Sequence, residues 1–283
     1  FKDDLKALLA FSTVSHLGLL TMLLGFGTKM AAIAAVFHII THLTFKAALF
    51  MSAGIIDHAA HTRDIRRLGG LRHLMPVTFV IATLAALSMA GIPLLNGFLS
   101  KEMMLEETLH TTLFGSPWLV PGLAVLGSLF SAAYSFRLIS HVFLGPERVD
   151  YPDHPHDPNP GLWLPPALLI IPVVGIGIAP FLVQDFVFLI ARSVIGGVGE
   201  LDVKYIKIWH GLVPALYMSI AAVVGGLILL AMKIASYRIV GGVLIGMIGM
   251  SLLLNIIGSD TNPLLAIPAH SPSVMGGFCA GVR

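Results

Sequence analysis

The sequence has few charged residues and a single cysteine. Of the 283 residues only 11% are Asp, Glu, Lys or Arg, whereas about 25% is usual in a soluble domain. Cys279 alone cannot form an internal disulfide framework or a metal site built from several cysteines. The formal net charge of +2 is too small to indicate binding to nucleic acid. No redox motif is present, so we expect this chain to hold no cofactor.

Apolar sequence, in contrast, is abundant. Hydrophobic residues make up 56% of the chain, and the mean hydropathy is +0.89. Apolar runs of about 20 residues, the length of a membrane-spanning helix, recur along the chain. This pattern predicts an all-α fold, a polytopic transmembrane helical bundle with about seven crossings. The predicted crossings are residues 5–27, 30–56, 75–112, 118–144, 163–190, 210–233 and 238–258.

The third predicted crossing is too long and too irregular for one straight helix. Gly91 and Gly97 flank Pro93 in its middle, and a proline removes a backbone donor and clashes with the preceding turn. A break at membrane depth is tolerated only where the backbone is buried in protein or lines water, and broken helices mark ion sites in many transporters. We therefore expect one discontinuous helix.

The second predicted crossing carries the strongest indication of function. His38, His42 and Lys46 occupy positions i, i+4 and i+8, so a helix places them on one face. Such a stripe is costly in lipid, which predicts that it faces protein or water. A buried lysine gives up its charge more readily than an exposed one, and histidine titrates near neutral pH. We expect these residues to translocate protons; the alternative is that the histidines only bond neighbouring helices.

Lys101 and Glu102 follow the break in the third crossing and form a second candidate proton-translocation site. In this interpretation, Glu102 or another carboxylate modulates the charge of a buried Lys101. In the alternative, the helix ends near Asn96 and Lys101 is an ordinary lysine at the membrane interface. The sequence alone leaves both interpretations open.

A few polar residues elsewhere are candidates for supporting roles. Arg137 lies within the fourth crossing and stays protonated, so it suits pairing with a carboxylate or holding water better than relaying protons. Ser12, Ser15 and His16 form a polar stripe in the first crossing that could hold water, although small polar residues also serve helix packing. Residues 150–159 contain histidines and aspartates between prolines; we interpret this segment as a solvated turn and expect no metal site.

Lys and Arg are distributed unevenly between the two ends of the predicted bundle. With alternating crossings, the loops on the side of Phe1 contain most of them, including a basic stretch at residues 63–72. The positive-inside rule then predicts that this side is cytoplasmic. The chain starts at Phe1 without a signal peptide and enters an apolar segment at once. We expect a fragment of a longer, multi-pass protein of the cell membrane.

Several short runs resemble the antiporter-like membrane subunits shared by Mrp-type cation/proton antiporters and respiratory complex I. They lie in the same order along roughly the first 145 residues, and three further runs are similar to the large A-type subunits of Mrp antiporters. The first set is DLK at 4–6, LAFSTVS at 9–15, FH at 37–38, TH at 41–42, FKA at 45–47, LGGL at 68–71, AGIP at 90–93 and GFLSKE at 97–102; the second is GIIDH at 54–58, TRDIR at 62–66 and WHG at 209–211.

The resemblance implies two inverted repeats of five helices, each with a discontinuous helix, followed by extra C-terminal helices. Residues 1–145 would form the second repeat, residues 146–258 additional transmembrane helices, and residues 259–283 an irregular tail. Lys46 would correspond to the central lysine of this repeat, with His38 and His42 as its connecting relay. Lys101 would correspond to the lysine of the discontinuous helix that faces the outer half-channel. From about residue 233 the sequence departs from the pattern of the large A-type subunits.

The favoured hypothesis is a proton-translocating subunit of a multi-subunit cation/proton antiporter. It would exchange cytoplasmic Na⁺ for external protons within the lipid bilayer, together with other subunits, as a secondary transporter and not an enzyme. The first alternative is a proton-pumping subunit of NADH:quinone oxidoreductase, whose partners would supply the redox chemistry and make it part of a translocase. The second alternative is a purely structural membrane subunit.

Overall fold

The computed structural model describes residues 3–113, 116–148, 151, 154–195, 206, 208–209 and 211–232. Over these residues every regular element is a helix, one of them a π-helical turn, and there is no β-strand. The elements are α1 (Leu5–Gly25), α2 (Lys29–Ala60), α3 (Leu71–Leu74), α4 (Pro76–Ala90), α5 (Asn96–Leu109), α6 (Leu119–Leu138), η1 (Ile139–Leu144), α7 (Pro160–Ile178), α8 (Phe181–Val194) and α9 (Pro214–Ala231).

Short polar side chains fix where the first helices begin. Asp4 precedes α1 and accepts a hydrogen bond from the backbone N–H of Ala7 at 2.8 Å. Thr28 precedes α2 and accepts from the N–H of Ala31 at 3.0 Å. Each bond satisfies a donor that the first helical turn leaves unpaired. At 32 residues and 1.5 Å per residue, α2 is roughly 48 Å long and extends beyond a hydrocarbon core of about 30 Å.

Asp157, in the described part of the loop before α7, caps another helix. Asp157 accepts hydrogen bonds from the backbone N–H groups of Val77 and Thr78 at 2.8 and 3.0 Å, and from the Thr78 hydroxyl at 2.7 Å. These residues form the first turn of α4, where a negative charge interacts favourably with the helix dipole. Asp157 is therefore engaged at the start of α4.

The predicted discontinuous helix is confirmed as α4 followed by α5. Gly91 ends α4 with a φ of +89°, a conformation that glycine adopts at little cost. Pro93 cannot donate a backbone hydrogen bond, and α5 starts only at Asn96. The Ser88 hydroxyl spans the break, donating to Asn96 Oδ1 at 2.7 Å and accepting from the N–H of Gly97 at 3.1 Å. The break is thus a defined joint held by polar contacts.

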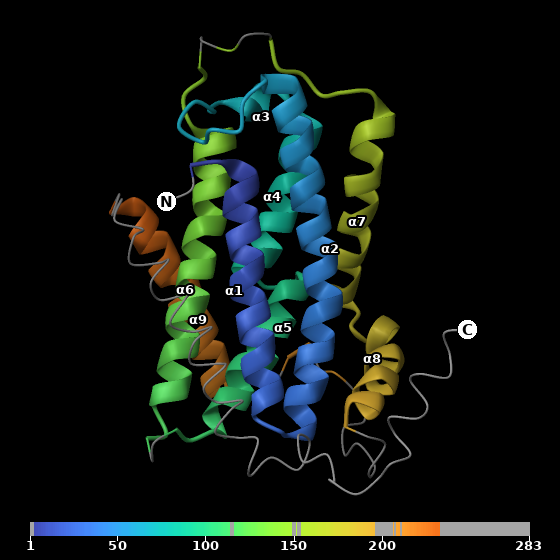
Figure 1. Ribbon diagram of the computed structural model, residues 1–283, viewed down its shortest axis with the longest axis vertical. Coiled ribbons are helices and arrows are strands. Elements are labelled where there is room, and N and C mark those ends of the chain that lie inside the picture. The colour runs from blue at the N-terminus through green and yellow to red at the C-terminus, as the bar shows by residue number, and fades with distance from the viewer. Residues whose placement is uncertain are drawn as a thin grey trace, which may run out of the picture.

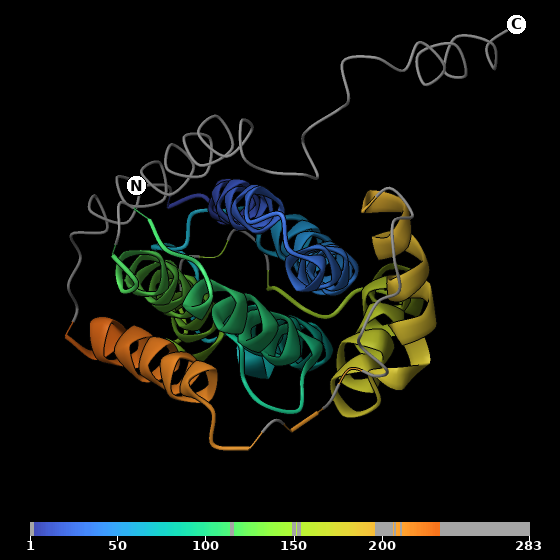
Figure 2. The same ribbon diagram turned by 90° about the horizontal axis from the view of Figure 1, so that it is seen from below.

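Other helices pack against both halves of this broken segment. Helix α2 packs against α1, α4, α5 and α7, while α9 packs along α6 on the opposite side of the bundle. Figure 1 shows α4 and α5 stacked end to end behind α1 and α2, and Figure 2 shows α6 and α9 on one flank with α7 and α8 on the other. At the break, Gly91, Leu95 and Asn96 are buried in the bundle, whereas Pro93 and Leu94 between them are exposed at its surface.

The described helices match the predicted crossings with one correction. Five are long and apolar enough to span a membrane: Leu5–Gly25, Lys29–Ala60, Leu119–Leu144, Pro160–Ile178 and Pro214–Ala231. The prediction of a single crossing at 163–190 was wrong, because the chain ends α7 at Ile178 and starts the separate helix α8 at Phe181. Pro180 lacks the N–H needed to continue α7. The predicted crossing at 238–258 and the tail at 259–283 lie outside the described residues.

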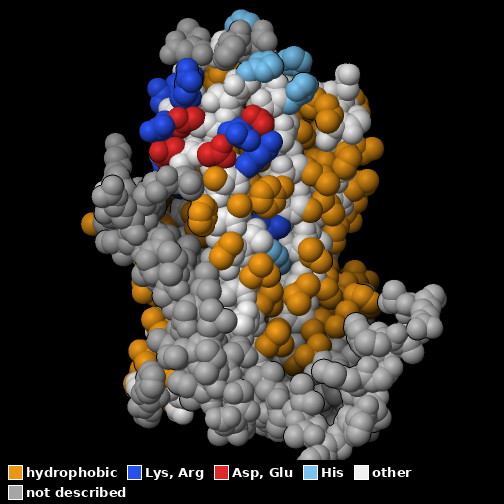
Figure 3. All heavy atoms as spheres, viewed as in Figure 1, with side chains coloured by type: hydrophobic (Ala, Val, Ile, Leu, Met, Phe, Trp, Pro, Cys, Tyr) orange, Lys and Arg blue, Asp and Glu red, His pale blue; other side chains and the backbone are white. Residues whose placement is uncertain are grey.

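The surface of the bundle matches a membrane setting. Many large apolar side chains are exposed along the helices, among them Leu43, Ile171 and Leu182. Figure 3 shows that charged side chains gather at the end of the bundle that contains α3, above a largely apolar flank. We call this end the charged end. Apolar flanks of this extent on a helical bundle are what lipid contact requires.

Candidate functional site

Side chains from α1, α2, α5 and α6 meet in a buried chain of hydrogen bonds. In its first half, His38 Nδ1 lies 2.6 Å from Ser100 Oγ, and His38 Nε2 lies 3.0 Å from His16 Nδ1. The other nitrogen of His16, Nε2, lies 3.1 Å from the hydroxyl of Tyr134. The two imidazoles are stacked with centroids 5.1 Å apart. Both ring nitrogens of both histidines are therefore engaged.

The second half of the chain leads to Lys101. The Tyr134 hydroxyl lies 3.0 Å from Ser131 Oγ, and Lys101 Nζ donates to the same Oγ at 3.1 Å. Ser131 also donates to the backbone oxygen of Met89 at 3.3 Å, and Lys101 to that of Ala90 at 3.1 Å. We call the path Ser100–His38–His16–Tyr134–Ser131–Lys101 the polar chain. It connects four helices without a gap longer than a hydrogen bond.

The break in the discontinuous helix explains the position of Lys101. Ala90 is the last residue of α4, so its carbonyl oxygen is one of those that the helix leaves unpaired. The negative end of the α4 dipole attracts an ammonium group there. Gly91 leaves room for the lysine, because a Cβ atom at Gly91 would lie 2.9 Å from Lys101 Cδ. Lys101 is only 6% exposed.

Lys46 approaches the polar chain from α2. Its Nζ donates to the Ser12 hydroxyl and, at 3.3 Å, to the backbone oxygen of Leu9. Ser12 also interacts with the hydroxyl of Tyr134, which brings Lys46 one side chain away from the polar chain. Lys46 is 4% exposed. Among the described residues, the hydrogen bonds of Lys46 and Lys101 all go to neutral oxygens.

His42 lies beside the polar chain and not within it. Its ring centroid is 5.1 Å from that of His16, 5.7 Å from that of His38 and 5.4 Å from that of Phe45. His42 Nε2 is buried and has no hydrogen-bond partner among the described residues. A buried imidazole nitrogen without a partner is costly unless water or a moving proton reaches it.

Lys101 lies within a helix and is buried. Helix α5 starts at Asn96 and continues to Leu109, so the helix does not end near Asn96 as the second interpretation assumed. Glu102 is also buried, at 3% exposure, whereas both hydrogen bonds of Lys101 go to neutral oxygens. Ser12 and His16 belong to the interior network, and Ser15 is buried on α1.

Tyr134, Ser131 and Ser100 were not among the predicted site residues. Ser131 and Tyr134 are three residues apart and therefore lie on the same face of α6, one turn before Arg137. Ser100 directly precedes Lys101 on α5. A polar stripe at helical spacing within an apolar crossing was the signal that could have identified the pair on α6.

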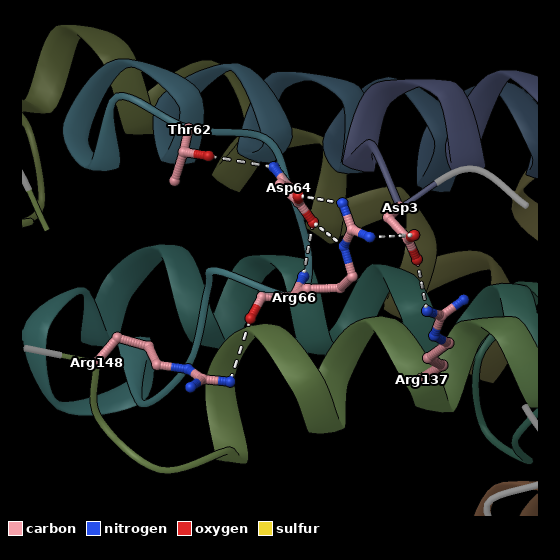
Figure 4. A network of polar contacts seen from close by, with 6 residues as sticks. All are labelled: Asp3, Thr62, Asp64, Arg66, Arg137 and Arg148. Atoms are coloured by element: carbon pink, nitrogen blue, oxygen red, sulfur yellow. Dashed lines mark hydrogen bonds and ion pairs between the residues drawn. The ribbon is translucent and has the colours of Figure 1, made fainter. Parts of the chain in front are cut away.

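Arg137 holds α6 to the charged end. Its Nη2 donates to Asp3 Oδ1 at 3.1 Å, and its side chain is 12% exposed. Asp3 also pairs with Arg66, which bonds Asp64 at 2.7 Å (Figure 4). The hydrogen bond from the Arg66 side chain holds the pKa of Asp64 below its ordinary value. Arg137 thus pairs with a carboxylate, as the sequence suggested.

An open cavity of about 790 Å³ lies at the charged end. It is lined by Asp3, Asp4, Asp57, His61, Thr62, Arg63, Asp64 and Arg66. The aspartates and arginines among them also form the ion pairs there. The described residues contain no group of His, Cys, Asp and Glu side chains arranged to hold a metal ion. The aspartates and arginines that line this cavity are therefore engaged in ion pairs.

Fold and site together define a polytopic helical membrane protein with buried amines and imidazoles in one hydrogen-bonded chain. The family model described as "NADH:quinone oxidoreductase/Mrp antiporter, TM" matches residues 1–131. The chain belongs to the family of antiporter-like membrane subunits that Mrp antiporters and NADH:quinone oxidoreductases share. The resemblance noted in the sequence is thereby confirmed.

Curated relatives and a solved structure are similar over most of this chain. A probable K⁺/H⁺ antiporter subunit of type A/B from Rhizobium meliloti (strain 1021) is 46% identical over 229 residues, which are 80% of this chain and 23% of that protein. An Na⁺/H⁺ antiporter subunit of type A1 from Staphylococcus haemolyticus is 38% identical over 249 residues, 81% of this chain and 31% of that protein. The Mrp complex from Dietzia sp. DQ12-45-1b matches with a TM-score of 0.73 and 32% identity, over 99% of this chain and 30% of the matched chain. This chain thus spans between about a quarter and a third of these proteins.

Proposed function

We propose that this chain is the proton-translocating part of a subunit of a multi-subunit monovalent cation/proton antiporter. Residues 1–145 form the second of two inverted repeats, and residues 146–258 contribute additional transmembrane helices. The relatives named as Na⁺/H⁺ and K⁺/H⁺ antiporter subunits support this assignment. Its partners are the other subunits of the complex, protons and a monovalent cation, for which we propose Na⁺. The chain acts as a secondary transporter and not as an enzyme.

One observation carries the proposal: two buried lysines have only neutral hydrogen-bond partners among the described residues. An ammonium group held by neutral oxygens in a low dielectric loses its proton more easily than one in water. Lys46 and Lys101 can therefore alternate between charged and neutral forms. His38 and His42 pass protons between them, because imidazole exchanges protons at both nitrogens. Buried Glu102 modulates the charge of Lys101 from the same helix.

The supporting residues keep this path hydrated and aligned. Ser12 accepts from Lys46, and His16 extends the relay from His38 towards α6. Ser15 lies on the same helix and adds polarity to the buried face of α1. Arg137 stays charged and holds α6 against Asp3, so its role is electrostatic. The coupled movement of the cation depends on parts of the complex beyond this chain.

The assembled complex provides the direct test of this function. We expect the purified complex to lack flavin and iron–sulfur absorbance, and after reconstitution to release protons from acidified vesicles when Na⁺ or K⁺ is added. Dequenching of a pH-sensitive dye measures the exchange, and a protonophore supplies the control that abolishes the pH gradient. Comparing Na⁺ with K⁺ also identifies the cation.

The alternative is a proton-pumping subunit of NADH:quinone oxidoreductase, with which the matching family is shared. In that case the purified complex would show flavin and iron–sulfur absorbance that NADH bleaches, and cation addition alone would release no protons. That result would overturn the antiporter assignment and make the chain part of an enzyme.

We also propose that the charged end faces the cytoplasm, in a protein of the cytoplasmic membrane. Lys6, Arg63 and Arg66 lie there with the start of α1, and the backbone N–H of Leu5 bonds the oxygen of Arg63 at 2.9 Å. Arg148 donates to the oxygen of Arg66 at 3.1 Å at the same end. An excess of Lys and Arg marks cytoplasmic loops, which supports this orientation.

Cysteine labelling tests the orientation. In a C279S background, we expect Arg67→Cys, in the exposed turn after α2, to react with a membrane-impermeant maleimide in inside-out vesicles and not in intact cells. Trp118→Cys is the matched control, because Trp118 is 77% exposed and precedes α6 at the opposite end. Its labelling pattern should be the reverse. Reaction of the Arg67→Cys variant in intact cells would show that the orientation is inverted.

A further inference from the structure

We propose that Tyr134 is a further proton-relay residue, whose hydroxyl connects the histidine pair to Lys101 through Ser131. This inference rests on the proposed function, since it names the route that protons take to Lys101. The phenol oxygen lies 3.1 Å from His16 Nε2 and 3.0 Å from Ser131 Oγ. In the described part of the chain, this hydroxyl bridges the two halves of the polar chain.

Counting donors and acceptors gives the polar chain a direction. Ser131 has one hydroxyl proton, which it donates to the carbonyl oxygen of Met89. It must then accept from both of its other neighbours, the ammonium of Lys101 and the hydroxyl of Tyr134. Ser12 also contacts the Tyr134 hydroxyl, but its own proton goes to the backbone oxygen of Leu9 at 2.8 Å. With the Tyr134 proton directed to Ser131, the Tyr134 oxygen accepts from His16.

The same count fixes both histidine tautomers. A neutral histidine has one N–H and one bare nitrogen. If His16 donates from Nε2 to Tyr134, its Nδ1 is bare and accepts from His38 Nε2–H. His38 Nδ1 is then bare and accepts from the Ser100 hydroxyl at 2.6 Å. Every donor on the path therefore points from Ser100 towards Ser131, which is the arrangement required to deliver a proton to Lys101.

Proton transfer along this arrangement balances at each atom. When Lys101 is neutral, its lone pair replaces the Met89 oxygen as the acceptor for the Ser131 proton. Ser100 passes its hydroxyl proton to His38 Nδ1 and takes up a proton from water in its place, and His38 releases its Nε2 proton to His16 Nδ1. His16 then releases its Nε2 proton to Tyr134, whose own proton passes to Ser131.

The last transfer moves the Ser131 proton to Lys101 Nζ, which becomes an ammonium. One proton has been taken up and one has been bound, and only Lys101 has changed its net charge. All donors then point the opposite way, so the path must reset by rotation of the hydroxyls and exchange of the histidine tautomers before it delivers again. Removing the Tyr134 hydroxyl would leave His16 Nε2 and Ser131 without a common partner.

Tyr134→Phe in the complete complex tests this role, because it removes only the hydroxyl and keeps the ring. We expect a loss of exchange of roughly 100-fold, a typical contribution of a proton-transferring group, with normal assembly. Tyr217→Phe is the matched control: Tyr217 lies on α9 and is 57% exposed, so this variant should exchange normally. Dye dequenching in vesicles measures exchange, and native gel electrophoresis measures assembly.

Ser131 provides a second, independent pair of variants. Ser131→Ala should lose exchange to the same extent, whereas Ser131→Thr keeps a hydroxyl and should retain most of it. Ser135→Ala controls for the loss of a buried serine on α6, since the Ser135 hydroxyl donates to the backbone oxygen of Ser131, away from the polar chain. If the role of Ser131 were purely structural, the alanine and threonine variants would not differ in exchange in this way.

The outcomes separate this inference from the proposed function. Near-normal exchange by Tyr134→Phe, with Lys46→Ala inactive, would overturn the role of Tyr134 and leave the function intact. Normal exchange by Lys46→Ala would overturn the function itself. If Tyr134→Phe fails to assemble, the two Ser131 variants provide the test. Loss of exchange in Ser131→Ala together with retained exchange in Ser131→Thr supports the inference. Normal exchange in Ser131→Ala overturns it.

Discussion

Replacing Lys46 by alanine is expected to abolish cation-dependent proton exchange in vesicles while the complex still assembles. Lys46 is buried on α2 and reaches the polar chain through Ser12. An alanine there has no group that can bind a proton, so charge can no longer alternate at this position. The loss should be roughly 100-fold to 10,000-fold, the range for a proton-transferring group. Dequenching of a pH-sensitive dye after cation addition measures it.

Two further lysine variants identify the cause of that loss. Lys46→Arg keeps the positive charge but does not release its proton, since a guanidinium stays protonated in proteins. It should be as inactive as alanine if the lysine must lose its proton. Lys6→Ala removes a partly exposed lysine that pairs with Asp57 at the charged end, outside the polar chain, and should exchange normally. Full activity of Lys46→Arg would show that a fixed charge suffices and would exclude proton exchange at this position.

The sequence predicted those parts of the site that lie along one helix. His38, His42 and Lys46 share a face of α2 because helical spacing alone puts them there. The broken helix could also be predicted, because Gly91 and Pro93 act on the local backbone whatever surrounds them. Burial of Lys101 could not be decided from sequence, since it depends on how α5 packs against α4 and α6.

Contacts between distant helices were the part that sequence could not supply. His16 and Tyr134 are separated by 118 positions, and Lys101 and Ser131 by 30. Nothing in the spacing of either residue indicates its partner, because relative rotation and register of the helices set the contact. Tyr134 was therefore not among the predicted site residues. His42, although on the predicted stripe, faces beside the polar chain for the same reason.

The misassigned crossing at 163–190 has a different origin. Three prolines, Pro165, Pro166 and Pro172, are accommodated inside α7, so proline alone did not mark the end of that helix. Helix α7 ends at Ile178, two residues before Pro180, and Phe181 starts a new helix with apolar and polar residues on opposite faces. Hydropathy averaged over a window does not distinguish such a helix from the continuation of a spanning one.

The second large effect is expected on stability, from Gly97→Ala in the first turn of α5. A Cβ atom at this position would lie 1.9 Å from the backbone oxygen of Ser88, far inside van der Waals contact. Neither the end of α4 nor the start of α5 can move away easily, because the Ser88 hydroxyl bonds both Asn96 and the N–H of Gly97. Forcing α4 and α5 apart should cost about 3 kcal/mol, the upper part of the usual range for overpacking.

Gly54→Ala is the matched control for this prediction. Gly54 lies within α2, and a Cβ atom there would meet nothing within 4 Å. Alanine is favoured over glycine in a helix interior by about 1 kcal/mol, so this variant should unfold at the same or a higher temperature than the parent. The Gly97→Ala complex should unfold several degrees lower, as followed by loss of folded complex on heating in detergent. Equal stability of the two variants would contradict the close approach of α4 and α5. Because that approach also sets the distance from Lys101 to the Ala90 carbonyl, exchange should fall in the Gly97 variant and not in the Gly54 variant.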